Sequence, residues 1–453
     1  MDSKSFSRRD FLTTSSAALA GSMVLSPFAG FAKSAQTNKM RIAIVGTGIR
    51  ALGMWSKRVA DLYPDNVEFV GLCDINPGRV EYFKKATGFT CPTFTDFDEM
   101  MKQVNPDTLI VTTVDSTHDE FIVKGLEKGI NVITEKPMTT DEKKCERILQ
   151  AEKKSKGKVK VTFNYRYSPH RAKMYELLRS GAIGDLTSVD FHWYLDTRHG
   201  ADYFRRWHRL KEKGGTLLVH KATHHFDLLN WWIESDPVEV YAAGDLEFYG
   251  KNNPFRHANC RGCPHKDKCK FYWDMTRNQT LMDLYAANEK YDGYLRDGCV
   301  WREDIDIYDK MAATIKYANG VQVSYSLTTY SPYEGYRIAF NGTKGRIDAW
   351  IEESNPIEPK GYDEIVVFPN FGEREFIRIP QGEGHGGGDK ILLDSIFLGL
   401  KVDPLHQAAG SRDGALSILV GIAARKSIET GKVVKIADLT SIKPQEKRVF
   451  VEI

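Results

Sequence analysis

The sequence predicts an α/β protein whose first half is a doubly wound parallel sheet. Two observations predict this class. Short runs rich in Val and Ile alternate with helix-like segments between residues 41 and 163. The first run leads directly into a glycine turn, Gly46-Thr47-Gly48, that opens a helix-like segment. The composition agrees, because 42% hydrophobic and 27% charged residues are typical of a globular protein.

The first half is expected to be an NAD-binding Rossmann domain over residues 38–163. Its strands are expected at 41–46, 67–73, 108–112, 130–134 and 158–163. The helices are expected between them, at 50–62, 77–86, 116–128 and 140–154. Each strand run is short and bounded by turn or helix signals, as in βαβ units.

An export signal is expected before this domain. Ser7-Arg8-Arg9-Asp10-Phe11-Leu12 is a twin-arginine pattern, and the residues from 13 to 30 are small or apolar and uncharged. We expect residues 1–32 to be a twin-arginine signal peptide, with a disordered, uncleaved terminus as the alternative. The export machinery would then be a partner, the protein would be periplasmic, and its cofactor would be loaded in the cytoplasm. The net charge of +3 favours neither nucleic acid nor an anionic membrane as a partner.

The glycine turn predicts a dinucleotide site. Gly46 to Ala51 fit the pattern G-x-G-x-x-G/A, in which the first glycine allows the tight turn and the second lets the backbone approach a pyrophosphate. Asp74 ends the second strand, 26 residues after Gly48, where a carboxylate accepts hydrogen bonds from ribose hydroxyls and repels a 2′-phosphate. This favours NAD, with a helix N-cap as the alternative role of Asp74. Arg50 and Arg79 lie close enough in the sequence to keep NADP possible as the cofactor.

Four motifs in a fixed order make the chain resemble a known family. They are the glycine turn with Cys73-Asp74-Ile75-Asn76-Pro77, then Glu135-Lys136-Pro137, then Asn164-Tyr165-Arg166-Tyr167-Ser168-Pro169 with Gly181-Ala182-Ile183-Gly184, and finally Gly214-Gly215-Thr216-Leu217-Leu218 leading to His224-His225-Phe226-Asp227. From about residue 40 to its C-terminus, the chain resembles the Gfo/Idh/MocA family of sugar and polyol oxidoreductases.

The resemblance implies a second, α+β domain over residues 164–453 that binds substrate and mediates oligomerisation. Its core would be a large, mostly antiparallel open sheet, and its late helix, at about 410–430, would pack back on the Rossmann domain. Strand-like runs at 185–195, 238–248, 311–317, 320–328 and 334–340 support this expectation. The exposed face of such a sheet implies a homo-oligomer, either a dimer or a tetramer.

Lys136 and His224 are the expected catalytic residues. Lys136 follows the fifth strand at its carboxyl end, where open α/β sheets bind ligands, and its ammonium could bond a substrate hydroxyl. The resemblance places His224 at the family's catalytic histidine and Asp227 three residues later, with His225 as the alternative histidine. Asp227 is included with the catalytic residues, although a supporting role or a helix cap is the simpler interpretation. The cofactor-binding residues are Gly46, Gly48, Ile49, Arg50, Asp74, Glu135 and Lys136.

Six further residues are expected to bind a carbohydrate substrate. The resemblance places Tyr165 and Arg166 against the nicotinamide and substrate, with structural hydrogen bonding as the alternative. Many family members carry Asp or Glu four residues before the catalytic histidine, whereas this chain has His220 followed by Lys221. Another loop with two polar ends, His385-Gly386-Gly387-Gly388-Asp389, could close over a sugar or simply start a helix. The six residues are Tyr165, Arg166, His220, Lys221, His385 and Asp389.

Four cysteines lie in or beside a polar, Lys-rich insertion. Cys260, Cys263 and Cys269 are closely spaced, and Cys299 follows. Such a set could form a structural zinc site, and disulfides are the alternative in an exported protein.

Three functions agree with these residues. The resemblance implies an NAD(P)-dependent oxidoreductase that transfers hydride between a ring carbon of a sugar, sugar derivative or glycoside and a tightly bound nicotinamide. The alternative is an NAD-dependent glycoside hydrolase, which would oxidise a ring hydroxyl transiently, eliminate the aglycone and return the hydride. A non-catalytic sugar-binding protein is the third, and the presence of Lys136, His224 and the glycine turn argues against it.

Overall fold

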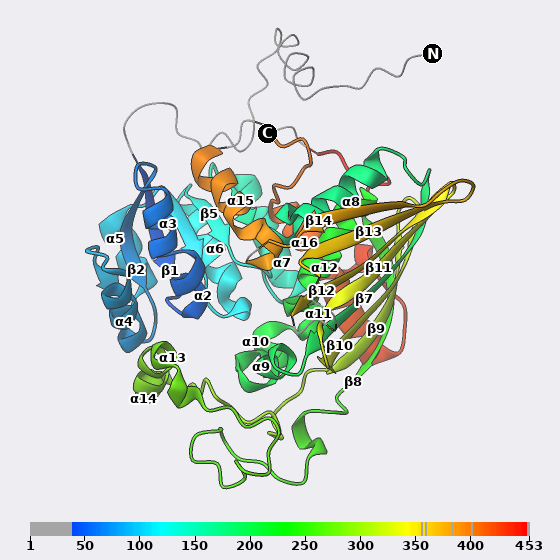
Figure 1. Ribbon diagram of the computed structural model, residues 1–453. Helices are drawn as coiled ribbons and strands as arrows, with labels where there is room; N and C mark the ends of the chain where they lie inside the picture. Colours follow the sequence, from blue (N-terminus) through cyan, green and yellow to red (C-terminus); the bar gives the residue numbers. More distant parts are fainter. Residues whose placement is uncertain (1–38, 355–356, 358–359, 383, 400–401, 451–453) are drawn as a thin grey trace.

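The computed structural model describes residues 39–450, apart from 355–356, 358–359, 383 and 400–401. Two sheets, one parallel and one mostly antiparallel, lie side by side and define two domains (Figure 1). The α/β class expected from the sequence, with an antiparallel second domain, is confirmed. The expected signal peptide, residues 1–32, falls outside the described residues.

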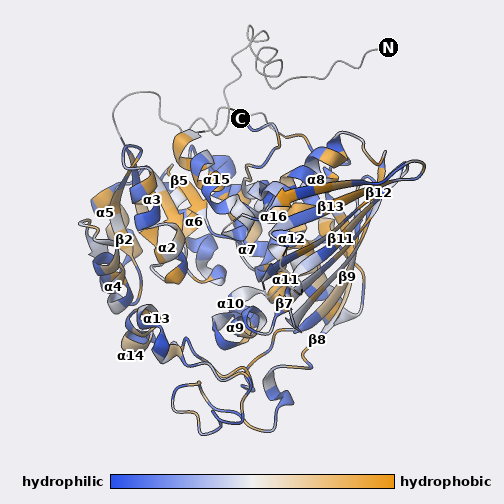
Figure 2. Ribbon diagram, in the orientation of Figure 1, coloured by the Kyte–Doolittle hydropathy of each residue, from blue (hydrophilic) through white to orange (hydrophobic). Residues whose placement is uncertain are grey.

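The first domain is a six-stranded parallel sheet in the order β3-β2-β1-β4-β5-β6. This order changes direction next to β1, and ligands of open α/β sheets bind at such a point, outside the carboxyl ends of the strands. Residues of β1 and β4 are almost fully buried, and Figure 2 shows the apolar colouring of this sheet between its covering helices. The strands are β1 Met40–Val45, β2 Val67–Cys73, β3 Thr93–Phe94, β4 Thr108–Val111, β5 Asn131–Thr134 and β6 Val159–Val161.

Within residues 39–163, six helices cover this sheet, and they differ from the expected set in two places. The helix expected at 50–62 is broken at Trp55 and Ser56, because Ser56 Oγ donates a hydrogen bond of 2.6 Å to Leu52 O and its backbone is not helical. The short β3 and α5 had not been expected. The helices are α2 Ile49–Met54, α3 Lys57–Leu62, α4 Pro77–Thr87, α5 Phe97–Val104, α6 His118–Glu127 and α7 Glu142–Lys154.

The second domain is a nine-stranded sheet in the order β14-β13-β12-β11-β7-β10-β9-β8-β15. Neighbouring strands are antiparallel, except for the parallel pair β7 and β10. Burial alternates along β9 and β10, so one face of the sheet packs on helices and the other is more open. The strands are β7 Leu186–Asp196, β8 Pro237–Asp245, β9 Lys310–Tyr317, β10 Gln322–Ser331, β11 Glu334–Gly342, β12 Gly345–Ser354, β13 Tyr362–Pro369, β14 Glu375–Pro380 and β15 Val434–Lys435.

The packed face of this sheet is covered by helices that also touch the first domain. Helix α16 (Ser411–Thr430) contacts α12 and β8 on one side and α7 and β6 on the other, so it lies between the two domains. None of the helices within the described residues is long and apolar enough to span a membrane. The other helices around the sheet are α8 Pro169–Arg179, α9 His199–Arg205, α10 Lys211–Gly214, α11 Leu217–His220 and α12 Ala222–Ile233. Helix α15 (Gly388–Asp394) packs Leu392 and Leu393 on the core of the first domain.

A long excursion between β8 and β9 returns to the first domain. It carries two short helices, α13 (Gln279–Leu284) and α14 (Glu289–Asp292), which lie beside α4 at the bottom left of Figure 1. The second domain therefore touches the first through α16 and through this excursion, among other contacts.

Candidate active site

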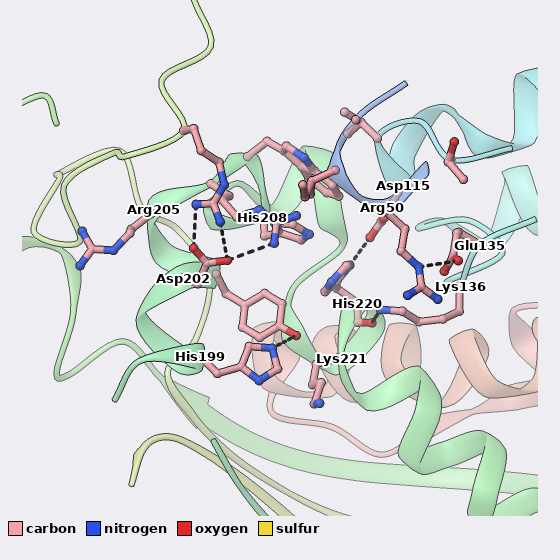
Figure 3. Close-up of a pocket in the computed structure, with 18 of the residues that line it drawn as sticks. Arg50, Asp115, Glu135, Lys136, His199, Asp202, Arg205, His208, His220 and Lys221 are labelled. Atoms are coloured by element: carbon pink, nitrogen blue, oxygen red, sulfur yellow. Dashed lines mark hydrogen bonds and ion pairs between the residues drawn. The ribbon is translucent and has the colours of Figure 1, made fainter. Parts of the chain in front are cut away.

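A cleft of about 2290 Å³ runs between the domains and brings most of the expected residues together. One end is lined by the glycine turn and Asp74, and the other by side chains of the second sheet and its helices. Figure 3 shows the middle of the cleft, where residues from both domains face each other. The expected residues that line it are Gly46, Gly48, Ile49, Arg50, Asp74, Glu135, Lys136, Tyr165, His220, Lys221, His224 and His385.

The glycine turn is shaped for close approach of a ligand. Gly46 has φ +90°, and a Cβ on it would lie 2.6 Å from the backbone carbon of Thr112, so only glycine fits. A Cβ on Gly48 would meet only the Tyr285 hydroxyl, at 3.2 Å, among the non-neighbouring described atoms within 4 Å. The backbone at Gly48 is therefore open toward the cleft, as the pyrophosphate of a dinucleotide requires.

Asp74 is held at the end of β2 by the turn itself. Its Oδ2 accepts a hydrogen bond of 2.8 Å from Thr47 N, and its Oδ1 accepts one of 2.9 Å from Asn76 N. The N-cap of α4 is Asn76, whose side chain accepts from the Arg79 amide, so Asp74 is not the helix cap. A carboxylate fixed at this place fits the ribose of NAD.

The two arginines that kept NADP possible as the cofactor are both paired with carboxylates. Arg50 Nε donates to Glu135 Oε1 at 2.6 Å, and Arg79 Nη2 lies 2.5 Å from Asp292 Oδ2. Arg79 also lies 3.6 Å from Asp74. Because each guanidinium already has a carboxylate partner, the argument that either would bind the 2′-phosphate of NADP is weaker.

Lys136 projects into the cleft from the carboxyl end of β5. Its Nζ donates a hydrogen bond of 3.2 Å to the backbone oxygen of His220, which joins the two domains at this point (Figure 3). Burial lowers the pKa of the Lys136 ammonium to about 8. A lysine with such a pKa exchanges its proton close to neutral pH, as a catalytic base must.

A carboxylate that the sequence did not single out lies next to this lysine. Asp115 Oδ2 is 2.5 Å from His220 Nδ1 (Figure 3), and burial raises the pKa of Asp115 well above its usual value. Burial also lowers the pKa of His220 well below its usual value. The position that is acidic in many family members is thus a histidine here, and the first domain supplies a carboxyl group to it. Asp115 and His220 are 105 residues apart, so no local pattern could reveal the pair.

His224 lies on the first turn of α12 and stacks on Tyr165. The two ring centroids are 4.1 Å apart with planes at 16°. Its Nδ1 is buried and makes no hydrogen bond within the described residues. Burial lowers the pKa of His224 well below its usual value, so the ring is neutral at pH 7 and Lys136 has the better matched pKa.

A hydrogen-bonded chain lines the substrate end of the cleft. Lys221 Nζ donates to the Tyr165 hydroxyl at 3.1 Å and lies 3.8 Å from Glu334 Oε1. Glu334 also bonds His199 Nδ1 at 2.8 Å, and the Nε2 of His199 bonds Tyr203 OH at 3.0 Å. This chain offers several hydroxyl-binding groups, and three of its members, His199, Tyr203 and Glu334, had not been singled out from the sequence.

Arg166 and Asp227 do not line the cleft, contrary to expectation. Arg166 is fully buried, and its guanidinium makes two hydrogen bonds to Asp227, of 2.8 and 2.6 Å, and one of 3.0 Å to Asp413. Asp227 is 1% exposed. These residues therefore connect the segment carrying Tyr165 to α12 and α16, which corrects their expected roles in substrate binding and catalysis.

The glycine-rich loop contributes one of its two polar ends. His385 lines the cleft, and its Nδ1 bonds Asp389 Oδ2 at 3.0 Å. Asp389 lies behind it, where its Oδ1 accepts a hydrogen bond of 2.7 Å from Asn164 Nδ2. Asp389 therefore orients His385 and does not itself face the cleft, so its expected contact with substrate is corrected.

The four cysteines do not form the expected zinc site. Cys260, Cys263, Cys269 and Cys299 surround a cavity of only about 10 Å³, and all four thiols are free of disulfides. Among the described residues, no group of three or more potential ligands is placed to hold a metal ion. Arg205 Nη1 lies 3.2 Å from Cys260 Sγ, so a guanidinium already occupies the place beside that thiol.

Comparison with known proteins identifies the family. Residues 40–163 match the oxidoreductase family model described as an NAD-binding Rossmann fold, and residues 175–436 match its C-terminal alpha/beta domain. The chain belongs to the Gfo/Idh/MocA oxidoreductase family.

Three relatives differ in how much of the chain they match. YteT of Bacillus subtilis, named as an oxidoreductase, is 41% identical over 421 residues, which is 88% of this chain and 98% of that protein. An inositol 2-dehydrogenase/D-chiro-inositol 3-dehydrogenase of Lactiplantibacillus plantarum is 26% identical over 46% of this chain and 56% of its own length. A glycosyl hydrolase family 109 protein of Akkermansia muciniphila is 25% identical over 43% of each chain.

Solved structures share the fold at lower identity. A levoglucosan dehydrogenase in complex with NADH and levoglucosan has a TM-score of 0.64 and 18% identity, covering 88% of this chain and all of the other. An aldose-aldose oxidoreductase of Caulobacter crescentus has a TM-score of 0.60 and 17% identity, covering 88% and 100%. At this identity the likeness establishes the fold alone.

Proposed function

We propose that the protein is an NAD-dependent oxidoreductase that transfers hydride between a ring carbon of a sugar, or of a related polyol or glycoside, and a tightly bound nicotinamide. One observation carries the proposal: Lys136, with a pKa lowered by burial to about 8, lies in the same cleft as the open glycine turn. The names of the inositol and levoglucosan dehydrogenases support a polyhydroxylated substrate. NAD is favoured over NADP because Asp74 is fixed by its turn and both nearby arginines are paired.

Lys136 acts as the base in this proposal. Its neutral form takes the proton of the reacting hydroxyl, and the resulting ammonium stays hydrogen-bonded to His220 O. Neutral His224 offers a further hydrogen bond to the same hydroxyl, while Tyr165 and Lys221 bind other hydroxyls of the ring. Bound NAD would supply the hydride acceptor. The glycine turn and Asp74 would hold it.

The twin-arginine pattern leads us to propose that the chain is exported already folded, with its cofactor loaded in the cytoplasm. Assembly into a dimer or tetramer through the open face of the nine-stranded sheet belongs to the same proposal. Fractionation of cells that express the full chain tests the first point, and light scattering of the purified protein tests the second. Activity found only in the cytoplasmic fraction would contradict export.

The function is tested by offering purified protein a panel of sugars and polyols while the nicotinamide absorbance is followed. We expect at least one ring alcohol to reduce bound or added NAD in the wild type. Substitution of Lys136 by Met should abolish this reduction while nucleotide content stays unchanged. Reduction that persists in the Lys136→Met protein would remove Lys136 from the mechanism.

Glycoside cleavage without net oxidation is the second candidate. The likeness to a glycosyl hydrolase family 109 protein favours it, as does a cofactor that would stay bound through an oxidation and its reversal. An aryl glycoside separates the two candidates, because hydrolysis releases a phenol with no net change in NAD. A keto sugar as final product would favour the dehydrogenase.

A further inference from the structure

The excursion between β8 and β9 reaches the dinucleotide end of the cleft. Residues 275–294 leave the second domain, line part of the cleft and pack on α2 and α4 of the first domain (Figure 1). The Tyr285 hydroxyl accepts a hydrogen bond of 3.0 Å from the amide of Ile49, directly after the glycine turn. Tyr285 and Asp292 both line the cleft, on the same side as Gly48 and Asp74.

Polar contacts tie the same segment to the loop that carries Asp74. Asn76 Nδ2 donates a buried hydrogen bond of 3.0 Å to the backbone oxygen of Asn288. Arg79, on α4, lies 2.5 Å from Asp292 and 3.6 Å from Asp74, so it bridges the segment and the expected ribose-binding carboxylate. The segment therefore contacts both the phosphate-binding and the ribose-binding parts of the site.

Apolar packing supports these polar contacts. Met275, Leu281, Leu284 and Tyr285 form a small buried cluster, against which Ile49, Leu52 and Tyr82 of the first domain pack. The approach is close, because a Cβ on Gly78 of α4 would lie 1.8 Å from Asn288 Oδ1. Asn288 is itself fixed by hydrogen bonds from its Nδ2 to the backbone oxygens of Asp283 and Leu284. The segment thus rests on the first domain as a packed element.

We propose that residues 275–294 are a cofactor-binding strap, which holds NAD in the cleft through successive turnovers. The Tyr285 hydroxyl, placed at the glycine turn, is assigned to the pyrophosphate, and the pairing of Arg79 with Asp292 fixes the ribose end. A bound dinucleotide leaves only after the strap separates from α2 and α4, which breaks the contacts of Ile49, Asn76 and Arg79 described above. The proposal rests on the proposed NAD-dependent function and specifies how the cofactor is held.

Two glycine substitutions provide a matched test. Gly78→Ala forces the strap away from α4, because the added Cβ meets Asn288. Gly53→Ala makes the same change on the exposed side of α2, where no atom lies within 4 Å of the new Cβ. Tyr285→Phe removes the hydroxyl and keeps the ring. Near-ultraviolet circular dichroism of each protein confirms that it is folded.

Each purified protein is loaded with NAD and dialysed against nucleotide-free buffer, and the nucleotide left per chain is measured by mass spectrometry over time. We expect the wild type and Gly53→Ala to keep about one NAD per chain, and Gly78→Ala and Tyr285→Phe to lose it at least about tenfold faster. Loss at the wild-type rate in both strap variants would overturn the proposal, as would rapid loss from the wild type.

This readout is independent of the substrate. If retention of NAD depends on the strap but no sugar is turned over, the result contradicts the proposed reaction and supports the proposed strap. If sugars are turned over while NAD exchanges freely with solution, the result contradicts the proposed strap and supports the proposed hydride transfer.

Discussion

At the scale of single residues, burial lowers the pKa of both expected catalytic residues, but with different consequences for proton transfer. Burial brings the pKa of Lys136 down to about 8, within working range, and moves the pKa of His224 well below neutrality. The sequence predicted both Lys136 and His224 as catalytic, and an unperturbed histidine, which titrates near pH 6.5, could also exchange a proton. The lowered pKa of His224 favours our proposal that Lys136 is the base, since the pKa of a base should lie near the operating pH.

The first prediction concerns pH. Lys136 is protonated below its pKa of about 8 and is a base only above it, so kcat/KM for alcohol oxidation should rise through a single ionisation near pH 8. Initial rates between pH 6 and 10, at fixed ionic strength, measure it. Substitution of His224 by Asn should lower the rates without moving this ionisation, because His224 stays neutral throughout. A profile that is flat near pH 8 would contradict the assignment of the base.

The second prediction is the size of the lysine's contribution. Lys136→Met removes the base but leaves the aliphatic part of the side chain, so kcat should fall by about 10²- to 10⁴-fold. Steady-state kinetics with the best sugar of the panel measures this, together with NAD content per chain. Lys57→Met is the control, because Lys57 lies on the exposed surface of α3 and should keep wild-type kinetics. A fall below tenfold in Lys136→Met would exclude a role as general base.

At the scale of elements, a buried ionic network fixes the segment that carries Tyr165. Arg166, Asp227 and Asp413 link that segment to α12 and α16, and all three lie behind the cleft. The family resemblance placed Tyr165, Arg166 and Asp227 together at the site. It could not say which of them faces a ligand, because that depends on the direction of each side chain after the helices have packed.

The third prediction follows from this network. Asp227→Asn removes one of the two carboxylates paired with the buried guanidinium of Arg166 and leaves only that of Asp413. The free energy of unfolding should therefore fall by about 3–5 kcal/mol. Denaturant titration followed by fluorescence measures the change. Asp61→Asn breaks the exposed pair with Lys57 and should cost less than about 1 kcal/mol. Equal losses of unfolding free energy in the two variants would show that burial does not increase the contribution of the Arg166–Asp227 pair to stability.

The fourth prediction concerns the glycine turn. Gly46→Ala places a methyl group 2.6 Å from Thr112 at φ +90°, so the turn must distort where the pyrophosphate should bind. We expect the affinity for NADH to fall by at least about tenfold, measured by fluorescence titration of nucleotide-free protein. Gly88→Ala is the control, because it has a similar positive φ of 74° at the end of α4 with nothing near its Cβ. Equal weakening in both would point to general loss of stability.

Elements with strong local signals were predicted well. The parallel strands are runs of Val and Ile between helices, and the observed β1, β2, β4, β5 and β6 lie within one or two residues of the expected runs. The strands β12, β13 and β14 were not anticipated, although the alternation of polar and apolar residues along them is itself a strand signal. The break after α2 also escaped prediction, since it depends on a side chain that bonds the backbone of the preceding turn.

At the scale of the whole molecule, the sequence predicted two domains and a late helix packed against the first, but not the side-chain contacts that join them. The Asp115–His220 pair, the Tyr285–Ile49 contact and the Arg79–Asp292 pair each link residues from different domains that are 105 to 236 residues apart. Only the folded chain brings such residues together. The cysteine cluster illustrates the opposite error, because the close spacing of Cys260, Cys263 and Cys269 suggested a zinc site or disulfides, and the described residues show neither a group placed to hold a metal ion nor a disulfide.

The contacts between the two domains limit how the molecule moves. Helix α16, residues 275–294 and His220 all contact the first domain, so a hinge rotation about α16 would pull Tyr285 from Ile49 and Arg79 from Asp292. Many two-domain enzymes admit substrate by such a rotation, whereas here it would break these contacts. We therefore expect the domains to keep their relative positions when substrate binds. The radius of gyration in solution should accordingly be the same with and without a sugar.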